Sequence, residues 1–153
     1  MASRPSPPSP RRVIAHGDLH PFNVLADGKR WTLLDWTSAL VADPAYDIAF
    51  TTLILRHPPL TATAPLRPVI AAAGAALARR FHHAYRRHGG IIPDRQTFGW
   101  YTSLHALRIL TELHSWRHDS ARSGHASHPW TTLAAVAASV LSRITSIAVA
   151  PRQ

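Results

Sequence analysis

The chain has 153 residues, with seventeen lysines and arginines against eight acids and a formal net charge of +9. This length suits one domain with a hydrophobic core, and the absence of cysteine excludes disulfides and thiolate metal sites. Because no segment resembles a membrane span or a secretory signal, we expect a cytoplasmic protein without a membrane partner.

Residues 1–12 form the first segment and contain four prolines, three serines and three arginines. This composition has no apolar periodicity and predicts a disordered leader ahead of a folded domain over residues 13–150. The net charge raises nucleic acid as a partner. The arginines are scattered, however, and no nucleic-acid-binding signature accompanies them, so we do not expect that partner.

The segment His16-Gly17-Asp18-Leu19-His20-Pro21-Phe22-Asn23, followed by Leu34-Asp35-Trp36, carries the most informative spacing. An asparagine follows Asp18 by five residues, and Asp35 follows that asparagine by twelve. In phosphoryl transfer from a nucleotide, one acid accepts the proton of the attacking hydroxyl, while an Asn and another Asp hold magnesium. Taken singly, Asp18 is more simply interpreted as a solvated loop acid, Asn23 as a turn residue, and Asp35 as an acid at the end of a strand. Together they favour this chemistry.

Two short β-prone runs, 24–26 and 31–34, follow the motif. Between them lies Asp27-Gly28-Lys29-Arg30, and Asp-Gly tolerates the positive φ angles of a tight turn. The pattern predicts a β-hairpin that brings Asn23 and Asp35 side by side. Carboxylate and amide oxygens so placed suit magnesium.

A helix is predicted from Asp43 to about Arg56, because Asp43 is a good N-cap and Pro44 suits the first helical position. The helix stops before Pro58, which cannot continue it. Asp47 lies in the first turn, where the helix dipole favours an anion.

Further helices are predicted over 69–85 with an end at Gly89-Gly90, from Asp94 towards Trp116, and after Pro129. A polar loop is expected over residues 118–128. The sequence therefore predicts an α+β fold that is mostly α-helical, with one small hairpin and about four helices. His114 and His118 stand one turn apart, but no third metal ligand is evident, so a hydrated helix surface is the preferred interpretation.

The motif from His16 to Leu25, the Leu34-Asp35-Trp36 run and the segment 43–50 resemble those of aminoglycoside phosphotransferase and choline kinase-like phosphotransferases. In that family H-x-D-x-x-x-x-N is the catalytic loop of a protein-kinase-like fold. The resemblance implies a chain that corresponds to the C-terminal catalytic lobe, with the N-terminal lobe absent.

By position, the resemblance implies that Asp18 is the catalytic base and that Asn23 and Asp35 bind magnesium and the nucleotide cofactor. His16 is expected as structural support for the loop. For Asp47 two roles stay open, namely support of the catalytic loop and simple placement at the helix dipole.

The implied activity is ATP- and Mg²⁺-dependent transfer of a γ-phosphoryl group to a hydroxyl of a small molecule. Acids are few beyond residue 47, which argues against a polycationic acceptor, and Arg108, His105 and Arg117 suit a neutral or anionic one better. For each of these three, solvated surface charge is the simpler interpretation.

Two alternatives remain for the whole chain. The first is a truncated catalytic lobe with impaired activity, which is either a fragment from a truncated or misannotated reading frame or a half-enzyme completed by a separately encoded N-terminal lobe or by self-association, the fragment being the more economical explanation. The second is a noncatalytic kinase-derived remnant that acts as an interaction domain. Both expect an apolar face where the missing lobe would lie.

Overall fold

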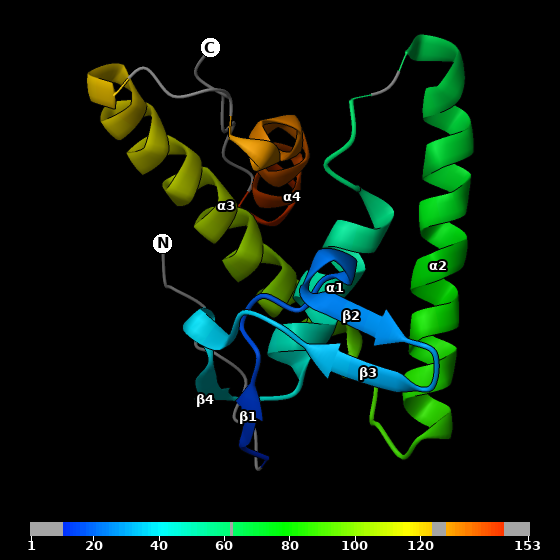
Figure 1. The fold of residues 1–153 in the computed structure, drawn as a ribbon. Coiled ribbons are helices and arrows are strands. Elements are labelled where there is room, and N and C mark those ends of the chain that lie inside the picture. Colours follow the sequence, from blue (N-terminus) through cyan, green and yellow to red (C-terminus); the bar gives the residue numbers. More distant parts are fainter. Residues whose placement is uncertain (1–10, 62, 124–127, 146–153) are drawn as a thin grey trace.

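The computed structural model describes residues 11–61, 63–123 and 128–145. Its strands and helices are, in chain order, β1 (Val13–Ala15), β2 (Val24–Asp27), β3 (Arg30–Leu33), β4 (Leu40–Ala42), α1 (Ala45–Arg56), α2 (Arg67–Arg87), α3 (Arg95–Ser123) and α4 (Ala134–Thr145). Short 3₁₀ turns occupy Pro21–Asn23, Trp36–Ser38, Ala64–Leu66 and Pro129–Leu133. The fold is α+β and mostly helical, as the sequence predicts (Figure 1).

Strands β2 and β3 form the predicted antiparallel hairpin, in which Val24 lies opposite Leu33. The turn glycine has a φ of +56°, which residues with a side chain rarely adopt. The Leu34 N–H donates to the carbonyl oxygen of Asn23 over 2.9 Å and extends the pairing by one step. Asn23 and Asp35 therefore leave the same end of the hairpin.

A second two-stranded sheet pairs β1 with β4, with Val13 opposite Ala42 and Ala15 opposite Leu40. The sequence did not predict this sheet, because strands of three residues carry no clear alternation of apolar and polar side chains. This sheet holds the segment before His16 beside the segment that leads into α1.

Helix α1 begins and ends where predicted. The Asp43 carboxylate accepts the N–H of Ala45 over 2.6 Å, and Pro44 has helical angles. The helix packs between α2 and α3, and its buried side chains join those of α3 and α4 in one core (Figure 1). The buried members of this core are Phe50, Leu53, Ile54, Ala106, Ile109, Leu113, Leu133, Ala137 and Val140.

Helix α2 lies close against α1 at Gly74. A Cβ atom on this residue would stand 2.4 Å from the carbonyl oxygen of Leu55, so only glycine allows this approach. The helix ends just before Gly89, whose φ of +83° stops it. The sequence predicted both the helix and this end.

Helix α3 starts after Asp94, whose carboxylate accepts the N–H groups of Gln96 and Thr97 over 2.8 and 2.9 Å. Its C-terminal end differs from the prediction. The helix continues to Ser123, so the polar loop expected over 118–128 is wrong for residues 118–123. None of residues 118–123 is glycine or proline, the two residue types least favourable in a helix.

The last predicted helix is present as a 3₁₀ turn that continues into α4. Leu133, Ala137 and Val140 from its apolar stripe are buried, while Ile147 lies outside the described residues. Within the described part of the chain, no helix has both the length and the apolarity needed to cross a bilayer.

Candidate active site

Asp47 holds the loop that carries the motif. Its Oδ2 accepts the main-chain N–H of His16 over 2.7 Å, and its Oδ1 accepts that of Gly17 over 2.9 Å. Gly17 has a φ of +82°, and a Cβ atom there would lie 2.0 Å from the carbonyl oxygen of Ser38. A residue with a side chain would therefore displace the loop from the segment after Asp35.

His16 is buried and joins the loop to the end of β3. Its Nε2 lies 2.8 Å from the carbonyl oxygen of Leu34, and its Nδ1 lies 3.3 Å from the N–H of Asp18. Because a carbonyl only accepts and an N–H only donates, the proton is on Nε2 and Nδ1 is the acceptor. Both ring nitrogens are therefore paired with main-chain atoms, one in the loop and one at the end of β3.

Asp18 lies at the centre of the site with 18% of its side chain exposed. Its Oδ2 is 3.3 Å from Nδ2 of Asn23 and 3.4 Å from Nε2 of His20, while its Oδ1 is 3.5 Å from Arg108. Burial favours the neutral acid and raises the pKa. The hydrogen bond and charge of His20, the charge of Arg108 and the hydrogen bond from Asn23 outweigh burial and lower the pKa of Asp18 below 3.8.

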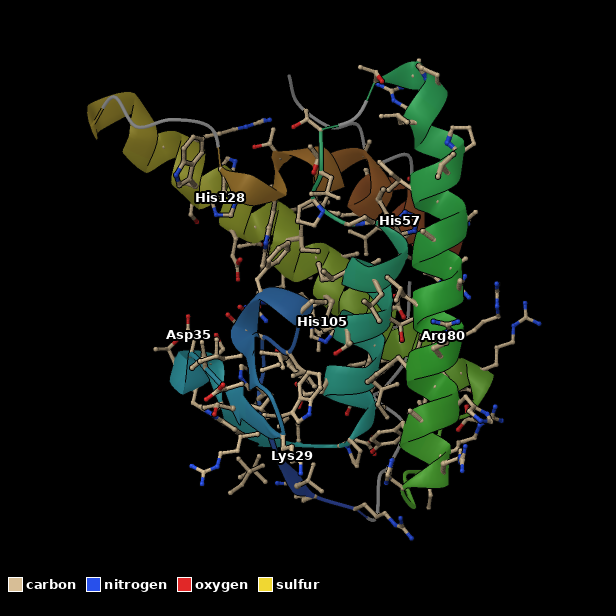
Figure 2. All side chains as sticks on the ribbon, turned by 45° about the vertical axis from the view of Figure 1, so that its right-hand side comes forward. Lys29, Asp35, His57, Arg80, His105 and His128 are labelled. Atoms are coloured by element: carbon tan, nitrogen blue, oxygen red, sulfur yellow. The ribbon has the colours of Figure 1, made fainter. Side chains whose placement is uncertain are left out.

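Asn23 is fixed by a second hydrogen bond, from its Nδ2 to the main-chain oxygen of Asp18 over 2.9 Å. Since the amide nitrogen faces Asp18, the amide oxygen is turned away from that residue. Asp35 is exposed at the outer edge of the molecule (Figure 2). Its Oδ1 accepts the hydroxyl of Thr37 over 2.5 Å and the N–H of the same residue over 3.4 Å.

Asp35 also has an unusual backbone. Its φ is +56°, and within residues 11–61, 63–123 and 128–145 it is the one residue other than glycine with a positive φ. Such strain persists only where the surroundings impose it, and it concentrates at functional sites. The sequence contained no signal for this conformation, because aspartate carries no strong preference for it.

The donor set of Asn23 and Asp35 fits a magnesium ion. Magnesium takes oxygen ligands, keeps several waters and binds one or two protein carboxylates beside nucleotide phosphates. No cluster of three or more His, Cys, Asp or Glu side chains suitable for a metal occurs in the described part of the chain. The His114 and His118 rings do lie together, 4.6 Å between centroids, but they gain no third ligand of those types there.

Two basic side chains, those of His20 and Arg108, face Asp18, and the sequence predicted neither contact. His20 lies two residues after Asp18 in the motif, so the spacing contained the signal. Solvated surface charge, the simpler interpretation of Arg108 and His105, is wrong, because His105 is fully buried in the interior (Figure 2) and Arg108 contacts the loop at Gly17. Neither placement follows from local sequence, since both depend on how α3 crosses α1.

A mainly apolar pocket of about 330 Å³ lies behind the loop, between the hairpin, α1 and α2. Its walls include Trp31, Thr51 and Phe81, and His20 also lines it. The Nδ1 atom of His20 is buried and has no hydrogen-bond partner among the described residues. His20 therefore stands between Asp18 and this pocket.

Comparison with known proteins agrees with this geometry. The profile of the Phosphotransferase enzyme family matches residues 2–91, a range that includes the loop, the hairpin and α1. The chain belongs to this family. The match confirms the resemblance to aminoglycoside phosphotransferases drawn from the motifs. That the chain corresponds to one lobe of such an enzyme stays a prediction.

One relative of this phosphotransferase-family chain is the uncharacterized protein YcbJ of Bacillus subtilis (strain 168), which is 58% identical over 36 residues. The matched segment covers 22% of this chain and 12% of YcbJ. No solved structure matches the chain.

Proposed function

We propose that this protein transfers the γ-phosphoryl group of ATP to a hydroxyl group of a small molecule, with Mg²⁺ as cofactor. The observation that carries the proposal is the linkage of Asp18, Asn23 and the segment that ends in Asp35. Asn23 contacts Asp18 through its side chain and Leu34 through its main chain. These contacts lie within the residues that match the family.

In this proposal Asp18 binds and orients the attacking hydroxyl. Its lowered pKa keeps the carboxylate ionised at neutral pH, so it accepts a hydrogen bond from the hydroxyl but is a weak proton acceptor. This suits a loose transition state, in which little proton transfer is needed before the phosphoryl group moves. Residues 13–150 would form the catalytic lobe.

The oxygens of Asn23 and Asp35 would hold the metal. When bound, magnesium neutralises charge on the nucleotide phosphates. The αL backbone of Asp35 and its hydrogen bonds from Thr37 fix the direction of its carboxylate. His16 and Asp47 would act through the backbone of the loop. The proposal also places the protein in the cytoplasm, where ATP is present.

The acceptor we propose is neutral or anionic. Arg108 already faces the Asp18 carboxylate, so a cationic acceptor would meet positive charge at the point of reaction. The Glu112 carboxylate lies 2.7 Å from Nε of Arg108. The negative charge of Glu112 is therefore already paired and does not attract a cationic acceptor.

Titration calorimetry with ATP and Mg²⁺ tests the nucleotide site. The wild-type chain should bind ATP in a saturable, magnesium-dependent manner, Asp35→Asn should lose this binding, and Asp27→Asn in the exposed hairpin turn should retain it. If the wild type shows no such binding, or if Asp35→Asn binds as well as Asp27→Asn, the proposed metal role is wrong.

A second candidate function is that of a noncatalytic interaction domain, and one specific observation favours it. Large apolar side chains are exposed over both small sheets, with Ile14 and Trp31 each 73% exposed and Val41 62%. The partner would be a strand-rich lobe in a separate polypeptide, or a second copy. Analytical ultracentrifugation tests self-association, because a chain that stays monomeric at high concentration does not pair with a second copy. A chain that binds no ATP but associates would support this function.

A further inference from the structure

Arg108 of α3 reaches the catalytic loop across 90 residues of sequence and engages it with its guanidinium group. Its Nε donates to Oε1 of Glu112 over 2.7 Å, its Nη1 donates to the carbonyl oxygen of Gly17, and its Nη2 lies 3.5 Å from Oδ1 of Asp18. Each of the three nitrogens therefore has an acceptor. A lysine has one nitrogen and could not make this set of contacts.

The guanidinium is also enclosed by aromatic rings. Its Cζ lies 5.3 Å from the ring centre of Phe50 in α1 and 5.7 Å from that of Trp130 in the 3₁₀ turn before α4. These distances are in the range of cation–π attraction. Only 22% of the Arg108 side chain is exposed. Its position is thus fixed by α1, α3 and the start of α4 together.

The two oxygens of Asp18 are divided between different partners. Oδ1 faces Arg108, and Oδ2 faces His20 and Asn23, so the plane of the carboxylate is defined from both sides. Burial disfavours the charge of Arg108. The hydrogen bond and charge of Glu112 and the charge of Asp18 outweigh burial and raise the pKa of Arg108.

We infer that Arg108 is a positioning residue that holds the Asp18 carboxylate in one orientation at the reaction centre. This inference rests on the proposed function for its catalytic meaning. The interaction itself is a property of the chain and can be measured without turnover. Charged hydrogen bonds of this kind, partly shielded from water, are stronger than those between exposed groups.

The test is a double-mutant cycle, in which urea unfolding measures the loss of stability caused by Asp18→Asn in the wild type and in three variants. Arg108→Met keeps the long apolar stem between Phe50 and Trp130 but removes the charge, and Arg108→Lys keeps the charge. Arg80→Met, on the exposed outer side of α2 (Figure 2), is the matched control. The loss caused by Asp18→Asn should be smaller in Arg108→Met than in the wild type, intermediate in Arg108→Lys, and equal to the wild-type loss in Arg80→Met. A loss in folded Arg108→Met as large as that in the wild type would overturn the inference.

A second measurement keeps Arg108 in place and covers the case in which Arg108→Met does not fold. At neutral pH, the side-chain N–H resonances of Arg108 should move between the wild type and Asp18→Asn, and resonances that do not move would overturn the inference.

In a phosphotransfer assay, Arg108→Met should lower kcat by about 100-fold, the scale of a misplaced reacting group, with the KM for ATP unchanged and partial recovery in Arg108→Lys. An inactive wild type would contradict the proposed function alone, since the unfolding and NMR readouts still decide the inference.

Discussion

The Asp47 carboxylate accepts the main-chain N–H of Gly17 over 2.9 Å, although 30 residues separate the two. Through the neighbouring N–H of His16 the same carboxylate holds the loop a second time. One acidic side chain at the start of α1 thus fixes the backbone that immediately precedes Asp18. Loop geometry and helix position are therefore coupled.

Replacing Asp47 by alanine should lower the free energy of unfolding by about 3 kcal/mol, because two partly buried N–H groups would lose a charged acceptor. The comparison is Asp43→Ala, where one local hydrogen bond to Ala45 is lost and a helix cap contributes about 1 kcal/mol. Urea unfolding measures both. Equal losses would show that Asp47 acts only at the helix end.

Gly17→Ala should destabilise the fold more than Gly28→Ala. Both glycines have positive φ, but a Cβ atom on Gly17 would meet the carbonyl oxygen of Ser38, while nothing lies within 4 Å of one on Gly28. We expect a cost of about 1 kcal/mol at Gly28 from backbone conformation alone, and a larger one at Gly17. Thermal unfolding compares them, and a Gly17→Ala protein as stable as Gly28→Ala would contradict the observed close approach.

Asp18→Asn should reduce phosphotransfer by roughly 10²- to 10⁴-fold, the usual contribution of a positioned acid or base. Asparagine preserves the shape of the side chain but not the negative charge that accepts from the hydroxyl. ATP binding should persist, since Asp18 is not one of the proposed metal ligands. Initial rates measure the phosphotransfer, and titration calorimetry measures the binding of ATP. Full activity in Asp18→Asn would remove Asp18 from the mechanism.

Acidification should destabilise the protein through His105. Burial lowers its pKa to about 4, with the charge of Arg108 acting in the same direction and the Tyr46 carbonyl and Asp18 opposing. Between pH 6.5 and about 4 the unfolded chain binds a proton at this position that the folded chain does not, so stability falls as pH falls. The loss attributable to His105 is roughly 3 kcal/mol once pH reaches 4.

Chemical denaturation at several pH values measures this slope. His105→Phe, which cannot take up a proton, should flatten it, whereas His114→Phe at an exposed position of the same helix should not. A wild-type stability that is the same at pH 7 and pH 4.5 would show that His105 does not control acid sensitivity. Burial also lowers the pKa values of His57 and His82, and both histidines are present in both variants, so the difference between the two slopes isolates His105.

Local signals determined much of this protein. Asp27-Gly28 sets the hairpin, Asp43 and Asp94 set two helix starts, and Gly89 ends α2, because each of these depends on neighbours a few residues away. The hairpin likewise followed from the sequence, and it pairs Asn23 with Leu34, the residue before Asp35.

Only the tertiary structure decided the pairing of β1 with β4, the burial of His105 and the contact between Arg108 and Asp18. Each joins segments whose own sequences are equally compatible with exposure, so the energy that selects the arrangement comes from the packing of α1 against α3 and not from local propensity. The sequence by itself identified the family and the residues of its motif, and the way the helices cross determined which charges face them.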